Sequence, residues 1–406
     1  MAALILFSIG KFMKLFLFYL SCFMAFVAGH MVNYSAILYS LEMFDSSLLA
    51  GLAYGLCFGP PIVFGWIAGA YIDRYSAKRV LLIAQNFFVL GGLGMLYVMA
   101  YQPESSIVIF LISSFLVGIA WSFVAPARFA AMTQYVSDEQ LPQSTITFNL
   151  LVMIGFGLAP ILLTQIQSEF EWKGVAITSI SMFFLSSLLL LNAPNVHERL
   201  SHENLKQEWL GCFNSMKSIP VIPQLLFSAI IGYLLMGPMQ VILPQVAEQQ
   251  LGLNTIEKGQ YLGLIALSLI IGGITAMKLK NMVPIGKTII VMLLLCGISM
   301  ALIGLIKTVW LSCLVLVVAT TLAGIVVSFI VAGLQHYTPV EIKGRVMSIY
   351  TIISQVISAM AGVLAGAIAQ GVSVPFSLYV VGSLFIVLTV ILFVKGQHIK
   401  QFDSFS

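Results

Sequence analysis

Long, uninterrupted apolar runs constrain this chain more than any other feature of its sequence. Each is close to the ~20 residues that a helix needs to cross the hydrocarbon of a bilayer. The runs occupy residues 15–41, 48–71, 80–101, 107–131, 144–166, 174–193, 221–245, 259–277, 288–306, 309–334, 346–369 and 376–394. A backbone in lipid must satisfy its own hydrogen bonds, and the alternating pattern of a membrane barrel is missing. We therefore predict transmembrane helices.

Composition excludes a soluble alternative. The chain is 60% hydrophobic and 8% charged, whereas soluble domains carry roughly 25% charged residues. Even a large soluble domain leaves about a quarter of its unfolded surface exposed, so this apolar surface must face membrane lipid. The expected fold class is an all-α membrane protein with twelve transmembrane helices in two pseudo-symmetric six-helix bundles.

A long polar segment divides the chain into two halves. We predict an N-terminal bundle over 1–193, a central loop over 194–220 and a C-terminal bundle over 221–406. A shift of 202 positions places Tyr135 on Tyr337 and Glu139 on Glu341. Parallel repeats of this kind occur in transporters, with the substrate site between the halves. Apolar positions 200, 205, 209, 210 and 213 in the loop predict an amphipathic helix on the inner leaflet or an ordinary linker helix.

Cationic residues indicate the orientation. All but three of the 19 Lys and Arg residues lie at the termini or in one set of alternate loops, the exceptions being Lys173, Lys258 and Lys307. Because cytoplasmic loops are enriched in Lys and Arg, both termini are expected to be cytoplasmic. The net charge of +4 reflects this asymmetry, so we expect no nucleic-acid partner.

Signals of enzyme chemistry are missing from the sequence. The five cysteines are scattered and predict no disulfide framework. We find no Cys/His pair with metal-ligand spacing, no Gly-x-Ser-x-Gly elbow, no phosphate loop and no His-Glu-x-x-His. We therefore expect no catalytic residue, no metal and no enzymatic activity. The first ten residues lack a basic start, so we expect an uncleaved lead into the first span or a start at Met13.

One loop carries a family resemblance. The stretch "GAYIDRYSAKR" at 69–79 resembles the loop 2–3 signature of the major facilitator superfamily. The segments "PARFAAMTQYVSDEQL" and "EIKGRVMSIY" resemble its enterobactin-exporter branch, whose members move siderophores and drugs out of bacteria. The stretch "GFGLAP" resembles a span-five exporter motif, with Ala159 in place of its usual Gly. The Arg usually found within span four is missing here, and the stretch reads "LISSFLVG". The resemblance implies the bacterial inner membrane and no cofactor, with proton coupling left open.

The same resemblance implies a gate on the cytoplasmic side. Asp73, at the end of span two, would accept hydrogen bonds at the N-terminus of span eleven, where the helix dipole favours an anion. The alternative is that these charges only anchor the loops. Arg128 would join this gate near Glu139 or meet an anionic substrate at the inner mouth. The predicted gating residues are Gly69, Asp73, Arg74, Lys78, Arg79, Arg128, Glu139, Glu341, Gly344 and Arg345.

Sparse polar residues inside the spans mark a candidate substrate cavity. His30, Asn33 and Tyr34 follow i, i+3, i+4 spacing and share one helix face. A polar group at this depth is a functional candidate. His30 could carry a proton, but a buried imidazole more often stays neutral and hydrogen-bonded, because desolvation disfavours its charge. The further cavity candidates are Trp121, Asn149, Gln240 and Gln355. For each Asn or Gln, the alternative is a hydrogen bond between helices.

These features predict a secondary active transporter that works by alternating access. Its expected cargo is a siderophore or another amphiphilic small molecule, exported across the inner membrane by a monomer. Import of a siderophore or nutrient is one alternative, and a lysophospholipid flippase of the same fold is another. A transporter-derived receptor would bind ligand without moving it.

Overall fold

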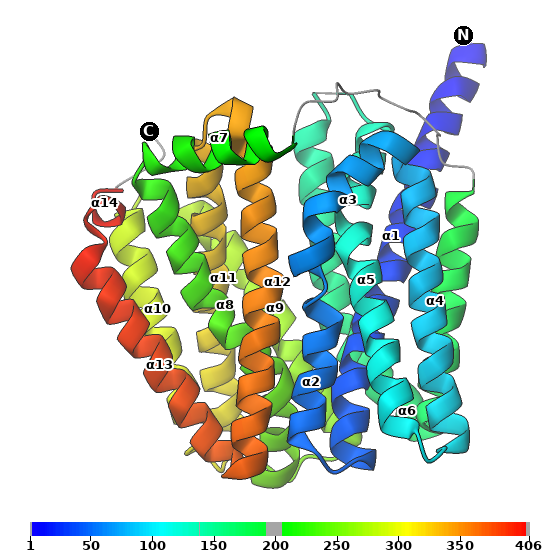
Figure 1. Ribbon diagram of the computed structural model, residues 1–406, viewed down its shortest axis with the longest axis vertical. Coiled ribbons are helices and arrows are strands. Elements are labelled where there is room, and N and C mark those ends of the chain that lie inside the picture. The colour runs from blue at the N-terminus through cyan, green and yellow to red at the C-terminus, as the bar shows by residue number, and fades with distance from the viewer. Residues whose placement is uncertain (1, 138, 192–204, 403–406) are drawn as a thin grey trace. The chain divides into compact units, whose positions relative to one another are not determined.

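The computed structural model describes residues 2–137, 139–191 and 205–402. Within these ranges, the side chains of residues 2–12, 66, 69, 70, 73, 74, 141, 142, 205–210, 340 and 341 lie outside the description. The described residues form helices and no strand (Figure 1). The helices are α1 (Ala2–Met43), α2 (Ser47–Phe58), α3 (Pro61–Tyr75), α4 (Ala77–Tyr101), α5 (Ser106–Thr133), α6 (Leu141–Leu190), α7 (Leu205–Lys217), α8 (Val221–Gln245), the π-helix η1 (Val246–Gln250), α9 (Thr255–Leu279), α10 (Ile285–Ile303), α11 (Val309–Tyr337), α12 (Val340–Gly371), α13 (Val374–Lys395) and α14 (Gln397–Lys400).

The predicted all-α membrane fold is confirmed. Within the described ranges, 11 helices are long and apolar enough to cross a membrane. One of them, Gln143–Leu190, has 48 residues, more than twice the length that one crossing requires. Its backbone leaves the helical region at Glu171, with φ 57° and ψ −173°. This break lies in the short interval between the predicted spans 144–166 and 174–193, and it divides α6 into these two spans.

The predicted second span differs from the structure. Residues 48–71 were expected to form one helix, but α2 ends at Phe58 and α3 begins at Pro61. Pro60 and Pro61 supply no backbone N–H, so the hydrogen-bond ladder is interrupted there. Gly118 of α5 lies against this break: a Cβ on it would approach Leu56 O to 2.2 Å. A bulkier residue at this position would push α5 away from the bend.

The described contacts divide the chain into two compact units. One contains Met1–Tyr39 and Leu56–Leu200; the other contains Ser40–Gly55 and Ser201–Ser406. The end of α1 and most of α2 thus group with the C-terminal helices. The predicted boundary near residue 193 falls among residues outside the description, so the domain division stays a prediction.

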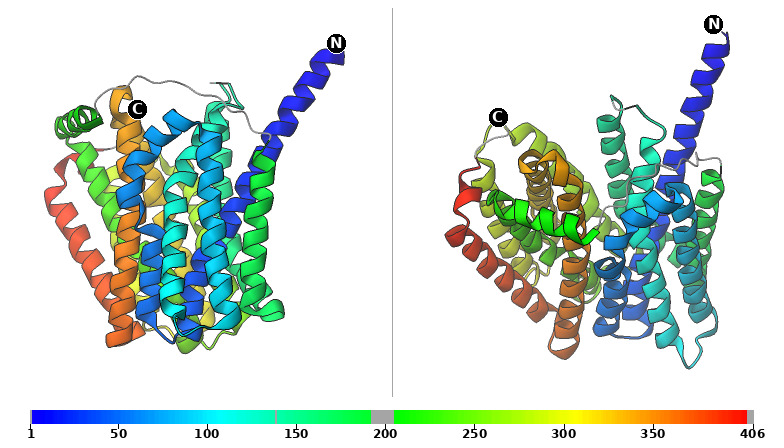
Figure 2. Two further views of the ribbon diagram at one scale, coloured as in Figure 1. Left: turned by 45° about the vertical axis from the view of Figure 1, so that its right-hand side comes forward. Right: turned by 45° about the horizontal axis from the view of Figure 1, so that its top comes forward.

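Each unit is held together by tight helix pairs. In the first, α4 packs on α5 and α6, and the rings of Phe88 and Phe183 stack with centroids 4.5 Å apart. In the second, the main pairs are α8 with α12, α9 with α11, and α10 with α13. Small residues permit these approaches in lipid. Helix α7 covers the ends of α8 and α12, as Figures 1 and 2 show.

The predicted loop helix is present as α7, although its apolar positions 200, 205, 209 and 210 lie outside the described side chains. The described buried face contains Cys212 and Met216, whereas Phe213 is exposed. The leaflet helix and the linker helix both stay predictions for α7.

Candidate functional site

The predicted face of α1 is buried and incompletely hydrogen-bonded. His30 is 7% exposed, and Asn33 and Tyr34 are fully buried. Four polar atoms have no hydrogen-bond partner among the described residues: His30 Nδ1 and Nε2, Asn33 Nδ2, and Tyr34 Oη. Buried polar groups are nearly always partnered, so a cluster of exceptions requires a cause such as a ligand or water. One turn of α1 therefore presents several unused hydrogen-bonding groups.

Aromatic rings surround this face within the first unit. The His30 ring lies 5.1 Å from Trp121 and 5.2 Å from Phe156, between ring centroids. Tyr34 lies 5.9 Å from Phe156. Trp121 Nε1 donates to Asn33 Oδ1 at 3.2 Å. We name His30, Asn33, Tyr34, Trp121 and Phe156 the His30 site.

Two glycines bring the helices of the His30 site close together. A Cβ on Gly29 would lie 2.7 Å from Trp121 Cζ2, so only a glycine lets the indole of α5 rest on α1. A Cβ on Gly155 of α6 would lie 2.8 Å from the Cβ of Phe26. The sequence thus places His30, Trp121 and Phe156 together by removing side-chain bulk beside them.

Arg128 lies in a different environment from the one expected. It is fully buried, and its guanidinium donates to Ser21 Oγ at 3.2 Å, Cys22 Sγ at 3.2 Å and Ser186 Oγ at 3.0 Å. Its Nε has no partner, and no carboxylate of the described residues pairs with it. Glu139 is exposed instead. The gating role of Arg128 stays a prediction, but its contacts here are neutral ones inside the first unit.

A polar network continues around Arg128. The Ser186 hydroxyl donates to Ser21 O at 2.8 Å and accepts from Gln85 Nε2 at 2.9 Å. Ser187 Oγ in turn donates to Gln85 Oε1 at 2.6 Å. These bonds join α1, α4, α5 and the second half of α6 through a single buried cluster. A charge satisfied by several neutral acceptors in this way is held rigidly in place.

The second unit holds a smaller set of polar candidates. Gln240 Nε2 donates to Tyr54 Oη at 2.9 Å, while Oε1 of Gln240 and of Gln355 has no partner among the described residues. Tyr233 and Tyr350, whose hydroxyls lie 2.8 Å apart, were not predicted from the sequence. Their spacing along the chain gives no local signal of this pair. The remaining predicted cavity residue, Asn149, belongs to the first unit and is exposed on α6.

The predicted cytoplasmic gate is only partly described. The side-chain surroundings of Gly69, Asp73, Arg74 and Glu341 lie outside the described residues. Ser76 joins α3 to α4 with φ 72°, a left-handed conformation that a non-glycine residue adopts only under constraint. The other predicted gating residues of these loops differ in exposure: Arg79 and Gly344 are exposed, and Lys78 and Arg345 are half-buried. Lys78 Nζ donates to Leu191 O.

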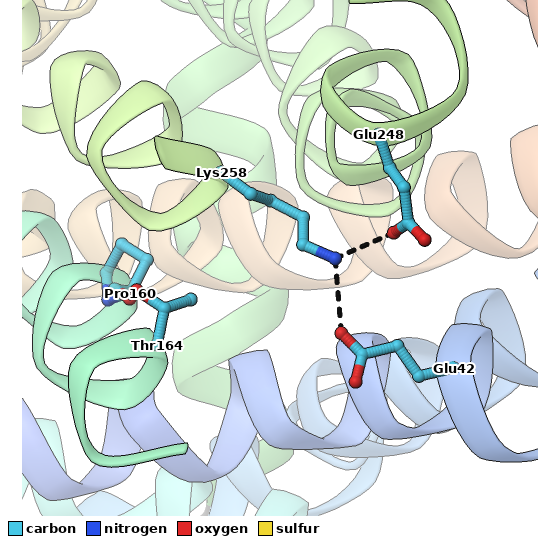
Figure 3. Close-up of polar contacts among 5 residues, drawn as sticks. All are labelled: Glu42, Pro160, Thr164, Glu248 and Lys258. Atoms are coloured by element: carbon cyan, nitrogen blue, oxygen red, sulfur yellow. Dashed lines mark hydrogen bonds and ion pairs between the residues drawn. The ribbon is translucent and has the colours of Figure 1, made fainter. Parts of the chain in front are cut away.

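The second unit also contains an ion cluster that was not predicted from the sequence. Lys258 Nζ lies 2.7 Å from Glu248 Oε2 and 3.1 Å from Glu42 Oε1, as Figure 3 shows. Its side chain is only 4% exposed. The available signal was that Lys258 is one of three cations on the cation-poor side. We name Glu42, Glu248 and Lys258 the Lys258 cluster.

Together, the long apolar helices and these buried polar sites define a multi-pass membrane protein of the transporter class. Residues 15–362 match the Major Facilitator Superfamily, and the chain belongs to that family. This confirms the resemblance noted in the "GAYIDRYSAKR" loop.

Relatives and solved structures agree with this assignment. The enterobactin exporter EntS of Shigella boydii is 25% identical over 362 residues, covering 86% of this chain and 85% of the relative. EntS of Escherichia coli K12 is 24% identical over 373 residues, covering 88% and 86%. A POT family transporter solved with 5-aminolevulinic acid has a TM-score of 0.75 at 13% identity, covering 95% of this chain and 96% of that one. A D-xylose–proton symporter has a TM-score of 0.74 at 14% identity, covering 95% and 97%. These two structures share the fold.

Proposed function

We propose that the protein is a secondary active transporter that exports a siderophore or another amphiphilic small molecule by alternating access. The family and the EntS relatives support transport of a small molecule out of bacteria. The single observation that carries the proposal is the His30 site, where unused hydrogen-bonding atoms lie among aromatic rings in the first unit.

The chemistry of the His30 site favours an aromatic or amphiphilic cargo. Ligand sites are mostly apolar, with a few convergent polar groups that fix orientation. Asn33 Nδ2 and Tyr34 Oη can donate hydrogen bonds, and the His30 ring can donate or accept. Trp121 and Phe156 supply ring faces and edges for stacking. This combination suits a cargo with a planar apolar face and neutral oxygen acceptors.

The setting of the transporter is part of the same proposal. The cation distribution supports cytoplasmic termini in a bacterial inner membrane. We propose a monomer with no cofactor, in which the residues around Asp73 gate the cytoplasmic side. A proton coupled to transport would be carried by a titratable side chain whose surroundings differ between the two transport states.

Reconstituted transport tests the proposal. Purified protein in liposomes would be given a labelled siderophore with and without a proton gradient, and flux would be followed in both directions. We expect gradient-dependent flux, with apparent affinity reduced about tenfold in His30→Ala. The matched control is His336→Ala, an exposed histidine in the last turn of α11. Binding without flux would identify a receptor and refute the proposal, and gradient-driven uptake in the import direction would refute export.

A further inference from the structure

A pocket of about 400 Å³ opens at the helix ends of the second unit, where α10 packs against α13 (Figure 1). Small-molecule sites are typically clefts of roughly 300–1,000 Å³, so the pocket can hold a small polar group. Its lining comes from η1, from the turn between α10 and α11, and from the start of α13, all within this unit. The lining residues are Gln249, Gln250, Gly304, Lys307, Val374 and Pro375, which we name the headgroup pocket.

Gln250 presents an unused hydrogen-bond acceptor in the headgroup pocket. Its Nε2 donates to Ile303 O at 2.9 Å and to Ile306 O, at and just beyond the C-terminal end of α10. These two bonds use both amide hydrogens and set the orientation of the side chain. The other amide atom, Oε1, is buried and has no partner among the described residues. Because buried acceptors are nearly always satisfied, this oxygen requires a donor from a ligand or from water.

Lys307 presents an unpaired positive charge in the same pocket. Its side chain is exposed, and it forms no ion pair within the described ranges. The Lys258 ammonium, by contrast, is paired with two carboxylates in the Lys258 cluster. The headgroup pocket therefore combines a cation that lacks an anion with an acceptor that lacks a donor.

Helix ends around the pocket divide it into two electrostatic halves. Helix α10 ends beside Gly304 and η1 ends at Gln250, and C-terminal helix ends favour a positive charge. Helix α13 begins at Val374, and an N-terminal helix end favours a negative charge. Lys307 adds to the half that attracts an anion. A ligand that carries both charges matches this arrangement.

The surroundings of the headgroup pocket are apolar and place it at the level of lipid headgroups. Its lining residues lie at the ends of candidate membrane spans or in the turns that join them. Large apolar side chains of the same two turns are exposed, namely Leu305, Trp310, Val372 and Phe376. Exposed Trp residues are typical of the boundary between membrane and water. Because α13 crosses the membrane between the pocket and the C-terminus, the pocket faces the leaflet on the opposite side from the C-terminus.

We propose that the headgroup pocket binds the headgroup of a phospholipid with a primary ammonium, phosphatidylethanolamine. The lipid phosphate lies against Lys307 and the start of α13, and the ammonium donates to Gln250 Oε1. The acyl chains follow the exposed apolar side chains of the two turns. Phosphatidylcholine carries the same charges, but its trimethylammonium has no N–H to donate to Gln250. Phosphatidylglycerol offers hydroxyl donors but no positive charge for the ends of α10 and η1.

Lipid titration tests this proposal without any cargo, so its outcome is independent of what the protein transports. Short-chain phosphatidylethanolamine, phosphatidylcholine or phosphatidylglycerol would be added to delipidated, full-length protein in detergent, and bound lipid would be counted by native mass spectrometry. We expect phosphatidylethanolamine to bind with a dissociation constant about tenfold lower than either other lipid. Lys307→Gln should raise this dissociation constant about tenfold, and Gln250→Leu should abolish the preference over phosphatidylcholine.

Two controls identify the site and the occupant. Lys173→Gln, at an exposed lysine of the first unit that is also predicted on the cation-poor side, should leave lipid binding unchanged. Glycerophosphoethanolamine, which has the headgroup without acyl chains, should bind more weakly than the lipid. Each variant would be checked by size-exclusion chromatography, and Lys307→Gln carries the test if Gln250→Leu does not fold. Equal binding of the three lipids, unchanged affinity in Lys307→Gln, or equally tight binding of glycerophosphoethanolamine would overturn the proposal.

Discussion

Gly29→Ala tests how the His30 site is assembled. The added Cβ would lie 2.7 Å from Trp121 Cζ2 and 3.2 Å from Cη2. The indole would have to move roughly 1 Å to restore the usual carbon–carbon separation of ~3.5–4.0 Å. Overpacking of this kind costs about 1–3 kcal/mol, whereas replacing a helical Gly by Ala gains about 1 kcal/mol. The expected net change is a loss of about 0–2 kcal/mol.

The functional effect of Gly29→Ala should be larger than its effect on stability. A displaced indole lengthens the 3.2 Å bond from Trp121 Nε1 to Asn33 Oδ1 and shifts the ring beside His30. A misplacement of about 1 Å in a positioning group can reduce activity by as much as ~100-fold. We expect transport to fall at least about tenfold while most of the protein remains folded.

The matched control for this prediction is Gly232→Ala on α8. No atom lies within 4 Å of a Cβ placed on Gly232, so this variant gains helix propensity without a clash. Melting temperature in detergent and initial transport rate in liposomes would be measured for both variants. If Gly29→Ala matched Gly232→Ala in both quantities, the close contact between α1 and Trp121 would not position the site.

Three further predictions concern charged or reactive groups. Asp73→Asn should reduce transport with near-normal expression; normal activity would exclude the predicted cytoplasmic gate. Arg128→Gln should change stability by no more than about 2 kcal/mol, because the buried charge is bonded only to neutral groups; a loss of about 3–5 kcal/mol in chemical unfolding would indicate a paired carboxylate instead. Burial raises the pKa of the Cys212 thiol, and the Arg345 charge partly opposes this rise. In a variant retaining only Cys212, the pH at which the alkylation rate is half-maximal should therefore lie above that of an ordinary thiol. Arg345→Gln should raise this pH further, and a downward shift would contradict the prediction.

The membrane fold could be predicted because its cause, the pattern of apolar runs, is local in the sequence. Apolar runs are long, continuous and separated by short polar breaks, so each span follows from the lipid environment alone. The turn at Glu171 also had a local signal in its polar residues. The break at Pro60 and Pro61 was missed although two adjacent prolines marked it, because hydropathy stays high across them.

The polar sites were only partly predictable. The shared face of His30, Asn33 and Tyr34 follows from helical spacing, but which rings cover it depends on α5 and α6. Local sequence carries no information on such distant neighbours. The same limit explains why the pair formed by Tyr233 and Tyr350 was missed, since these residues lie 117 positions apart. The substrate and gating roles assigned from sequence stay predictions.

Two buried cations, Arg128 and Lys258, solve the desolvation problem in different ways. Arg128 is compensated by Ser21, Cys22 and Ser186, all within the first unit. Its compensation therefore comes entirely from neutral groups of one unit. Lys258 is compensated partly by Glu42, on a segment whose two helices continue into the other unit. The Lys258 ammonium is thus paired with two carboxylates, whereas the Arg128 guanidinium is bonded only to neutral groups. Stability changes caused by substituting the two residues should therefore add independently in a double variant.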